Sequence, residues 1–186
     1  MKESRGVSQN LRSGVEVGPR DASEGGAPRF DRVDLGGLRV PVFDSFEIQP
    51  MPDGDVIVAV TVVQELTTVH LQAFSSEQAG PREGTGQSML NRMRTMGKSA
   101  GKWVGPIGAE ITGTYPAGRP DRQGLKVFAC GGPSWTLRGI ATGLGDEPES
   151  VDDWAYETFT GTVVVPDVWD GRDTTMASQW PQAARQ

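Results

Sequence analysis

The feature that most constrains the fold is a run of almost purely β-branched side chains at residues 56–63 (VIVAVTVV). β-branched residues favour strands, and an apolar run without polar alternation is typical of a strand covered on both faces. Residues 68–74 (TVHLQAF) alternate between apolar and polar side chains, which predicts a second strand. The stretch between them, residues 64–67, is too short for a parallel crossover, so we expect an antiparallel pair.

Further short apolar segments, separated by glycine and proline, predict more strands of the same kind. They are a hairpin at residues 30–42 that turns at Gly36-Gly37, and single strands at residues 46–51, 107–115, 125–129, 135–142 and 162–165. Two helices are predicted, at residues 87–98 with an apolar stripe and at residues 150–158 with Ser150 as the cap. These elements predict an α+β fold, a mainly antiparallel sheet with two helices packed on it. The expected core residues include Val58, Val60, Leu71 and Trp135.

The two ends of the chain contrast with this middle part. Residues 1–29 contain no aromatic side chain and little aliphatic surface, and the last residues are also polar apart from Trp180. Such segments cannot bury enough apolar surface to offset the entropy lost on ordering. We therefore predict a disordered leader at residues 1–29, a single domain at residues 30–170 and a flexible tail at residues 171–186.

Several classes of protein do not fit the composition. Cys130 is the only cysteine, so no disulfide can form within the chain. No apolar run approaches the roughly 20 residues of a membrane span, and the first residues lack the apolar core of a signal peptide. The formal net charge of −6 disfavours non-specific binding to nucleic acid or to an anionic membrane. We expect a cytoplasmic protein that does not insert into membranes.

Five segments, taken in order and spacing, resemble a known family. They are residues 31–42 (DRVDLGGLRVPV), 70–74 (HLQAF), 105–111 (GPIGAEI), 131–142 (GGPSWTLRGIAT) and 162–165. The chain is similar, over about residues 30–165, to an uncharacterised actinobacterial family classed as a domain of unknown function. The most specific part of the resemblance is residues 132–139 (GPSWTLRG). The resemblance implies a cytosolic protein with no established activity, and it brings no catalytic residues.

Residues of the types used in catalysis and metal binding are few. His70 is the only histidine and lies in the middle of a predicted strand, where we expect a structural residue at the surface or half-buried. Cys130 has only Lys126 nearby to activate it, so packing is the favoured role. One histidine and one cysteine are too few for a zinc site, and the acidic residues do not have the spacing of a calcium loop. We predict no catalytic residue, metal or cofactor, and the sequence favours a non-enzymatic protein.

An anion site is the alternative that stays open. The glycines Gly84 and Gly86 precede the helix predicted at residues 87–98, and the N-terminus of a helix exposes N–H groups that can bind an anion. Arg82 and Arg92 could add positive charge. The alternative function is then a small nucleotide- or phosphate-handling protein that uses the turn at residues 84–88, with a metal-dependent form recruiting the acids near residues 146–157.

The charges are segregated along the chain. Five basic residues and one acid lie in residues 82–102, whereas nine acids and one arginine lie in residues 144–173. Arg92, Arg94 and Lys98 lie off the apolar stripe of their helix, and Trp169 and Trp180 lie beyond the last predicted strand, where an aromatic residue is typical of docking. We therefore expect a non-enzymatic binding or scaffold protein, which recruits a protein partner or associates with itself through these residues.

Overall fold

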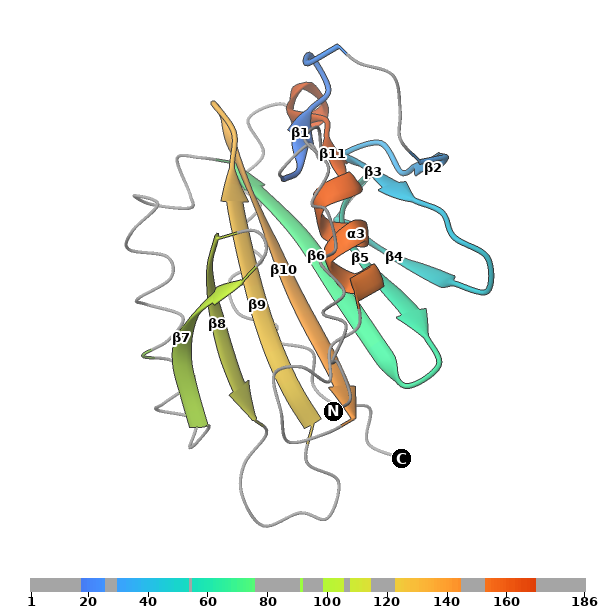
Figure 1. Ribbon diagram of the computed structural model, residues 1–186. Coiled ribbons are helices and arrows are strands. Elements are labelled where there is room, and N and C mark those ends of the chain that lie inside the picture. The colour runs from blue at the N-terminus through green and yellow to red at the C-terminus, as the bar shows by residue number, and fades with distance from the viewer. Residues whose placement is uncertain are drawn as a thin grey trace, which may run out of the picture.

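The computed structural model describes residues 18–25, 30–53, 55–75, 91, 99–105, 108–114, 123–144 and 153–169. Within them, strands form two sheets, and one α-helix, α3 (Asp153–Gly161), lies beside both (Figure 1). A short 3₁₀ turn, η2 (Pro166–Trp169), follows the last strand. None of the helices in the described ranges is long and apolar enough to cross a membrane.

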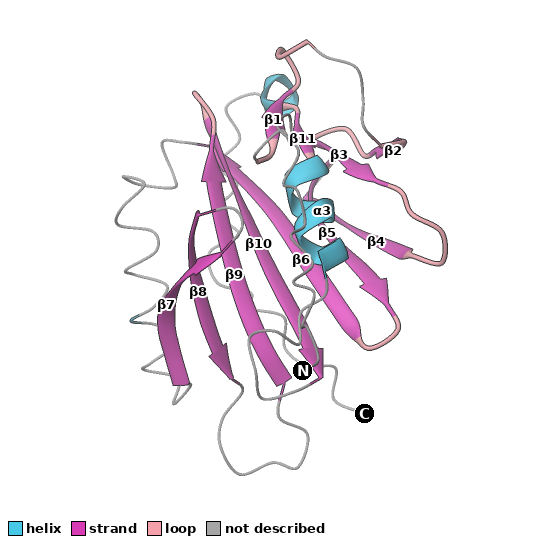
Figure 2. Ribbon diagram, in the orientation of Figure 1, coloured by secondary structure: helices cyan, strands magenta, loops and turns pink. Residues whose placement is uncertain are grey.

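The larger sheet has seven strands in the order β4-β5-β6-β10-β9-β8-β7, and every neighbouring pair is antiparallel. Its strands are β4 (Glu47–Asp53), β5 (Val56–Gln64), β6 (Thr67–Ser75), β7 (Ser99–Gly105), β8 (Gly108–Thr114), β9 (Gln123–Gly131) and β10 (Trp135–Leu144). The long central strands β6, β9 and β10 form the middle of the sheet, as the magenta arrows in Figure 2 show.

The smaller sheet has the order β1-β11-β3-β2 and includes the only parallel pair among the described strands, β1 with β11. Its strands are β1 (Arg20–Asp21), β2 (Arg32–Asp34), β3 (Leu38–Pro41) and β11 (Val163–Val164). Together with α3, this small sheet lies over one face of the larger sheet (Figure 1). We call this covered face the first face and the opposite one the second face.

The main core lies on the first face. Leu38 and Val40 of β3 and Phe159 of α3 are fully buried in one cluster with Val60, Leu71 and other side chains of the larger sheet. Gly139 of β10 allows the close approach of the helix, because a Cβ atom at that position would lie 2.7 Å from the Phe159 ring and 2.9 Å from the Phe128 ring. The spacing of Ala155, Thr158 and Phe159 places these three buried side chains on one side of α3.

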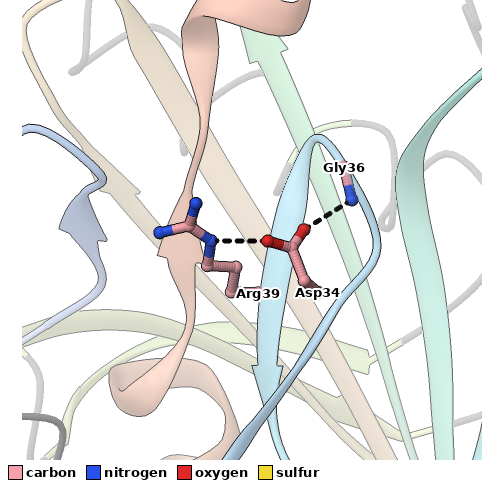
Figure 3. A network of polar contacts seen from close by, with 3 residues as sticks. All are labelled: Asp34, Gly36 and Arg39. Atoms are coloured by element: carbon pink, nitrogen blue, oxygen red, sulfur yellow. Dashed lines mark hydrogen bonds and ion pairs between the residues drawn. The ribbon is translucent and has the colours of Figure 1, made fainter.

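The β2–β3 hairpin shows how the turn residues set the register. Gly36 has a φ of 83°, in the left-handed region that favours glycine. The Asp34 carboxylate accepts a 2.9 Å hydrogen bond from the Gly36 amide, and it forms an ion pair with Arg39, whose Nε lies 2.9 Å from Oδ2 (Figure 3). The bond from the Gly36 amide, with a further contribution from Arg39, holds the pKa of Asp34 below its usual value. The sequence prediction of a turn at Gly36-Gly37 is confirmed.

The predicted fold class is confirmed in its coarser form, an α+β fold with a mainly antiparallel sheet. One of the two predicted helices is described, and it spans Asp153–Gly161 rather than residues 150–158. The other, at residues 87–98, lies outside the described residues except for Asn91, which is helical. Val60, Leu71 and Trp135 are core residues as expected, whereas the side chain of Val58 is not among those described.

Two strands were not predicted from the sequence. The strand β7 was missed because glycine and lysine interrupt its apolar pattern (SAGKWVG). The strand β1 lies inside the segment predicted as a disordered leader, and it pairs with β11 through Arg20↔Val163 and Asp21↔Val164. Part of the segment predicted as a leader is therefore paired in the smaller sheet.

Candidate protein-binding surface

Four aromatic side chains from three separate parts of the chain form a continuous row. The ring centroids are 5.2 Å apart for Phe30 and Phe43, 5.0 Å for Phe43 and Phe46, and 4.7 Å for Phe46 and Trp154. These separations and the tilted or edge-on geometries are those of favourable aromatic pairs. We call these four residues the aromatic row. All four are half-buried, so each ring keeps part of its surface in contact with solvent.

Three parts of the chain hold the aromatic row in place. Phe30 precedes β2 and packs beside Gly161, where an added Cβ atom would lie 3.0 Å from the Phe30 ring. Phe43 and Phe46 come from the loop between β3 and β4, in which Ser45 has a φ of 70°. A non-glycine residue in this left-handed region costs about 1 kcal/mol, so the surrounding contacts must fix the loop conformation. Trp154 comes from the first turn of α3.

The inner and outer members of the aromatic row differ in their contacts. Phe46 and Trp154 pack against the main core, whereas Phe43 is not among the residues in contact with that cluster. Val42, next to Phe43 in sequence, is 45% exposed. Phe43 is therefore a half-buried ring outside the main core cluster. Exposed aromatic surface of this kind is typical of protein-binding sites.

Acidic side chains accompany the aromatic row. Phe30 is followed by Asp31, Phe43 by Asp44, and Trp154 is preceded by Asp153, and the three acids are all exposed. Asp31 continues the β2–β3 ladder, because its carbonyl oxygen accepts a 2.9 Å bond from the Val42 amide, so its side chain and that of Phe30 point to opposite sides of the strand. Among the described residues, no basic side chain forms an ion pair with any of the three. We call Asp31, Asp44 and Asp153 the acidic rim.

A buried polar cluster joins the sheet to the other side of α3. Lys126 Nζ of β9 donates a 2.7 Å bond to the Tyr156 hydroxyl, which donates a 2.9 Å bond to Glu110 Oε2 of β8. Glu110 is 2% exposed and Lys126 is 6% exposed. Burial, followed by the hydrogen bond to Glu110, raises the pKa of the Tyr156 hydroxyl well above its usual value. The hydroxyl is therefore protonated, and its proton is already donated to Glu110, so this cluster ties α3 to the sheet.

A second polar cluster lies on the second face of the larger sheet. Thr61 Oγ1 of β5 and His70 Nδ1 of β6 are 3.1 Å apart. On the opposite neighbour of β6, Arg138 of β10 donates a hydrogen bond to Gln72 Oε1 of β6. The Arg138 guanidinium also lies 5.0 Å from the centre of the Phe74 ring. His70 is 9% exposed, so the expectation of a surface or half-buried residue was wrong. The cause is that β6, in the middle of the sheet, is buried on both faces over much of its length.

These clusters offer little for catalysis. Burial, with a further contribution from Arg138, lowers the pKa of His70 from 6.5 to about 4, so the ring is neutral at neutral pH and bonded to Thr61. Cys130 is partly buried and packs against the main core, and Lys126 lies four residues away in β9, about 13 Å along an extended strand. In the described part of the chain, no three His, Cys, Asp or Glu side chains gather as metal ligands would.

None of the site residues predicted from the sequence has a side chain that the structure describes. The anion-site residues and the basic helix residues are outside the described ranges, as is Trp180; they are Arg82, Gly84, Gly86, Arg92, Arg94 and Lys98. Trp169 ends the 3₁₀ turn, but its side chain is not described. The binding roles expected of these residues therefore stay predictions.

The aromatic row and the polar cluster around Tyr156 were missed by sequence reasoning. The four aromatic residues come from three separate segments, so no periodic pattern links them. One signal was available in the sequence, since an acid adjoins an aromatic residue in Phe30-Asp31, Phe43-Asp44, Phe46-Glu47 and Asp153-Trp154. Glu110 was also visible as an acid within an apolar strand pattern (GAEITGT).

Comparison with known proteins places the chain in a family. The sequence pattern of the family described as "Protein of unknown function (DUF3710)" matches residues 18–169. The chain belongs to the DUF3710 family. The match confirms the resemblance to a family of unknown function and begins before β1, so it includes the strand that the sequence patterns had placed in a leader. All the residues of the aromatic row lie within the DUF3710 match.

No curated protein matches this DUF3710 chain. Among solved structures, it is similar to LpqN, which is involved in cell envelope biogenesis of Mycobacterium tuberculosis. The two are 15% identical, the match covers 69% of this chain and 83% of the LpqN chain, and the TM-score is 0.43. A likeness of this size does not bear on function.

Proposed function

We propose that this protein is a non-enzymatic binding protein that recruits a protein partner through the aromatic row. The observation that carries the proposal is the row itself, four half-buried rings of which each contacts the next. Aromatic residues are enriched among those that contribute most to protein–protein affinity, because they bury a large area at a small cost in side-chain entropy. The loop between β3 and β4 holds Phe43 in the row, between the rings of Phe30 and Phe46.

The polar groups of the domain support a binding role over a catalytic one. The Tyr156 hydroxyl is engaged by both Lys126 and Glu110, and His70 is buried beside Thr61. A general acid or base has to reach a substrate within hydrogen-bonding distance, with a pKa near the working pH. The pKa of Tyr156 is raised and that of His70 is lowered, so neither pKa lies near neutral pH as a general acid or base requires.

The proposal is tested by photo-crosslinking inside the cells that naturally contain the protein, with the crosslinker placed in the aromatic row. The full chain carries benzoylphenylalanine in place of Phe43, and a matched control carries it in place of Met51. Met51 is also exposed, at 38%, but lies five residues beyond Phe46 along β4 and points to the second face. A covalent adduct of one size, formed from position 43 but not from position 51, is expected.

The adduct is then identified by mass spectrometry, and the purified partner is titrated with the chain by calorimetry. The double variant Val42→Ser/Phe43→Ser should weaken the affinity by about tenfold or more, because it removes the outer apolar contacts. Met51→Ser should leave the affinity unchanged. Equal crosslinking from both positions, or an unchanged affinity of the double variant, would exclude the aromatic row as the binding surface.

The basic helix residues Arg92, Arg94 and Lys98 and the tryptophans Trp169 and Trp180 remain candidates for further contacts with a partner or a second copy. Reversing the three basic charges to glutamate should abolish a salt-sensitive complex if they contribute to it. The alternative of a nucleotide- or phosphate-handling protein is tested by thermal shift with nucleotides, with and without Mg²⁺. A ligand that binds only the folded state raises the melting temperature.

A further inference from the structure

We infer that the second face of the larger sheet is a docking surface for the chain's own residues 76–98, which connect β6 to β7. In this inference the apolar stripe of the helix predicted at residues 87–98 packs on the sheet opposite α3. The segment lies outside the described residues apart from Asn91. The inference is independent of the binding role proposed for the aromatic row, and it rests on described burial, on the strand topology and on Asn91.

A cluster of apolar side chains is buried on the second face. Ile140 of β10 is opposite Val127 of β9, which is opposite Ile111 of β8, so the three lie side by side across the sheet. Val127 precedes Phe128 of the main core, so its side chain points away from the first face. The exposed fractions are 2% for Ile140, 5% for Val127, 7% for Ile111 and 1% for Leu125, which shares the face of Val127. None of these four, which we call the second-face cluster, belongs to the main core cluster.

The described elements do not account for this burial. Within the described ranges, α3 and the smaller sheet both lie on the first face (Figure 1). A large side chain in the middle of a sheet stays open to solvent on its own face unless a further layer covers it. Ile140 is nevertheless almost fully buried. A further layer over the second face is therefore required, and residues of this chain outside the described ranges have to supply it.

The strand topology indicates which segment supplies the layer. Four antiparallel pairings in succession, from β6 through β10, β9 and β8 to β7, make β6 and β7 parallel to each other. A connection between parallel strands of one sheet is almost always right-handed. Seen from the first face with β6 running upward, β7 lies to the left of β6 (Figure 1). A right-handed connection in this direction passes behind the sheet, which means across the second face.

The connecting segment is long enough for this path. The register places Ser75 level with Trp135, and it places Ser99 level with Gly143, eight residues further along β10. The two ends are thus about 26 Å apart along the strands and about 19 Å apart across four strand spacings, or roughly 32 Å in all. A helix over residues 87–98 spans about 18 Å, and the rest of the segment reaches up to about 36 Å. The path runs diagonally over β10, β9 and β8, the strands that carry the second-face cluster.

The predicted helix has the side chains to cover the cluster. Its apolar stripe consists of Met89, Leu90, Met93 and Met96, and methionine adapts well to irregular apolar surfaces. Asn91 is the described residue of this helix, and it is helical and exposed. At about 100° per residue, Asn91 lies about 160° from both Met89 and Met93 around the helix. The exposure of Asn91 therefore turns the stripe toward the protein.

The inference has a consequence for the basic residues of this helix. Arg92 and Arg94 lie beside the stripe, so their charges stay in solvent on the outer side of the added layer. The aromatic row includes Trp154 of α3, which lies on the first face. The basic residues and the aromatic row are then on opposite sides of the sheet, and one small partner does not reach both.

Methyl NMR of the full natural chain tests the packing directly. Isoleucine δ1 and methionine ε methyl groups are labelled with ¹³C, and nuclear Overhauser effects between them are recorded. We expect contacts from at least two of the stripe methionines to Ile140 and Ile111. Met51 serves as the internal control, because its side chain is exposed on the second face at β4 and should show no contact to Ile140. Stripe methyl groups that contact Ile48 on the first face, or that contact neither Ile140 nor Ile111, would overturn the inference.

Melting curves give a second, independent test. Met93→Ala should lower the melting temperature by about 5 °C or more, because it removes a buried side chain, whereas the matched control Asn91→Ala should change it by less than about 2 °C. The loss should be non-additive with Ile140→Val by about 2 °C or more, because contacting residues couple. It should be additive with Val60→Ala, which alters the main core on the first face. A Met93→Ala variant that melts like the natural chain, or one that couples to Val60 and not to Ile140, would show that the stripe does not cover the second face.

Discussion

Asp21 lies in the segment that the sequence predicts to be a disordered leader, yet it accepts the hydrogen bond of the most deeply buried tryptophan among the described residues. Trp135 Nε1 donates to Asp21 Oδ2 at 2.7 Å, and Ser23 donates to Oδ1 from its amide at 2.9 Å and from its hydroxyl at 2.7 Å. The bonds from Ser23 hold the pKa of the Asp21 carboxyl below its usual value, although burial opposes this shift. The carboxylate is therefore charged at neutral pH, and its bond to the indole N–H is charge-assisted.

Asp21→Ala should lower the free energy of unfolding by about 2–3 kcal/mol. A hydrogen bond to a charged group contributes roughly 1.5–3 kcal/mol, and the variant leaves the indole N–H buried without its acceptor. Losing the bonds from Ser23 lowers the free energy of unfolding by less, because the Ser23 amide and hydroxyl can bond to water when the carboxylate is removed. For a chain of this size the melting temperature falls by roughly 2–4 °C per kcal/mol, so a decrease of about 5–10 °C is expected by circular dichroism.

A double-mutant cycle with Trp135→Phe isolates the bond, since phenylalanine keeps most of the apolar surface but has no donor. The coupling energy between the two positions should be about 1.5 kcal/mol or more. Asp34→Ala is the control, because Asp34 is 58% exposed and its ion pair with Arg39 should contribute less than about 1 kcal/mol. If Asp21→Ala costs as much in the Trp135→Phe background as in the natural chain, the assigned role of this bond is refuted.

Three other perturbations probe β1, His70 and Gly139. Deleting residues 1–17 should leave the melting temperature nearly unchanged, whereas deleting residues 1–29 removes β1 and should lower it at least as much as Asp21→Ala does. Because burial lowers the pKa of His70 from 6.5 to about 4, the unfolded chain binds a proton in that window that the native chain does not. Stability should therefore fall by up to about 3 kcal/mol as the pH decreases from 6.5 to 4, and His70→Gln should reduce this dependence. Gly139→Ala should cost about 1–3 kcal/mol in urea unfolding, because the new Cβ atom would displace Phe159 and Phe128.

Each of these predictions has a result that contradicts it. Equal melting temperatures for the two deletions would mean that β1 contributes nothing to stability. Parallel pH curves for His70→Gln and the natural chain would show that the imidazole does not resist protonation in the fold. A Gly139→Ala variant as stable as the natural chain would mean that α3 can move away from the sheet at no cost. Gly36→Ala measures the separate effect of backbone conformation, because Gly36 has a positive φ and no atom lies within 4 Å of an added Cβ.

Much of the sheet could be predicted from the sequence because its signals are local. The β-branched run that became β5, the alternation in β6 and the glycine turn between β2 and β3 each depend on neighbouring residues. Core residues could be assigned for the same reason, as large apolar side chains on the face of a clearly predicted strand that turns inward; they are Val60, Leu71 and Trp135. Such patterns determine which residues form strands and which strands can pair as hairpins.

The tertiary structure decided what no local pattern contains. β1 has two residues, too few for any periodicity, and it exists because β11 and the Trp135 indole supply its partners from more than 100 residues away. His70 is one of the polar residues in the alternating pattern of residues 68–74, which suggests an exposed face. The position of β6 between β5 and β10 in the middle of the sheet nevertheless buries it. The aromatic row likewise forms only when α3 packs beside the loop between β3 and β4, which brings Trp154 to Phe46. Sequence spacing specifies the faces of single elements, whereas burial and contacts between distant segments depend on how those elements pack together.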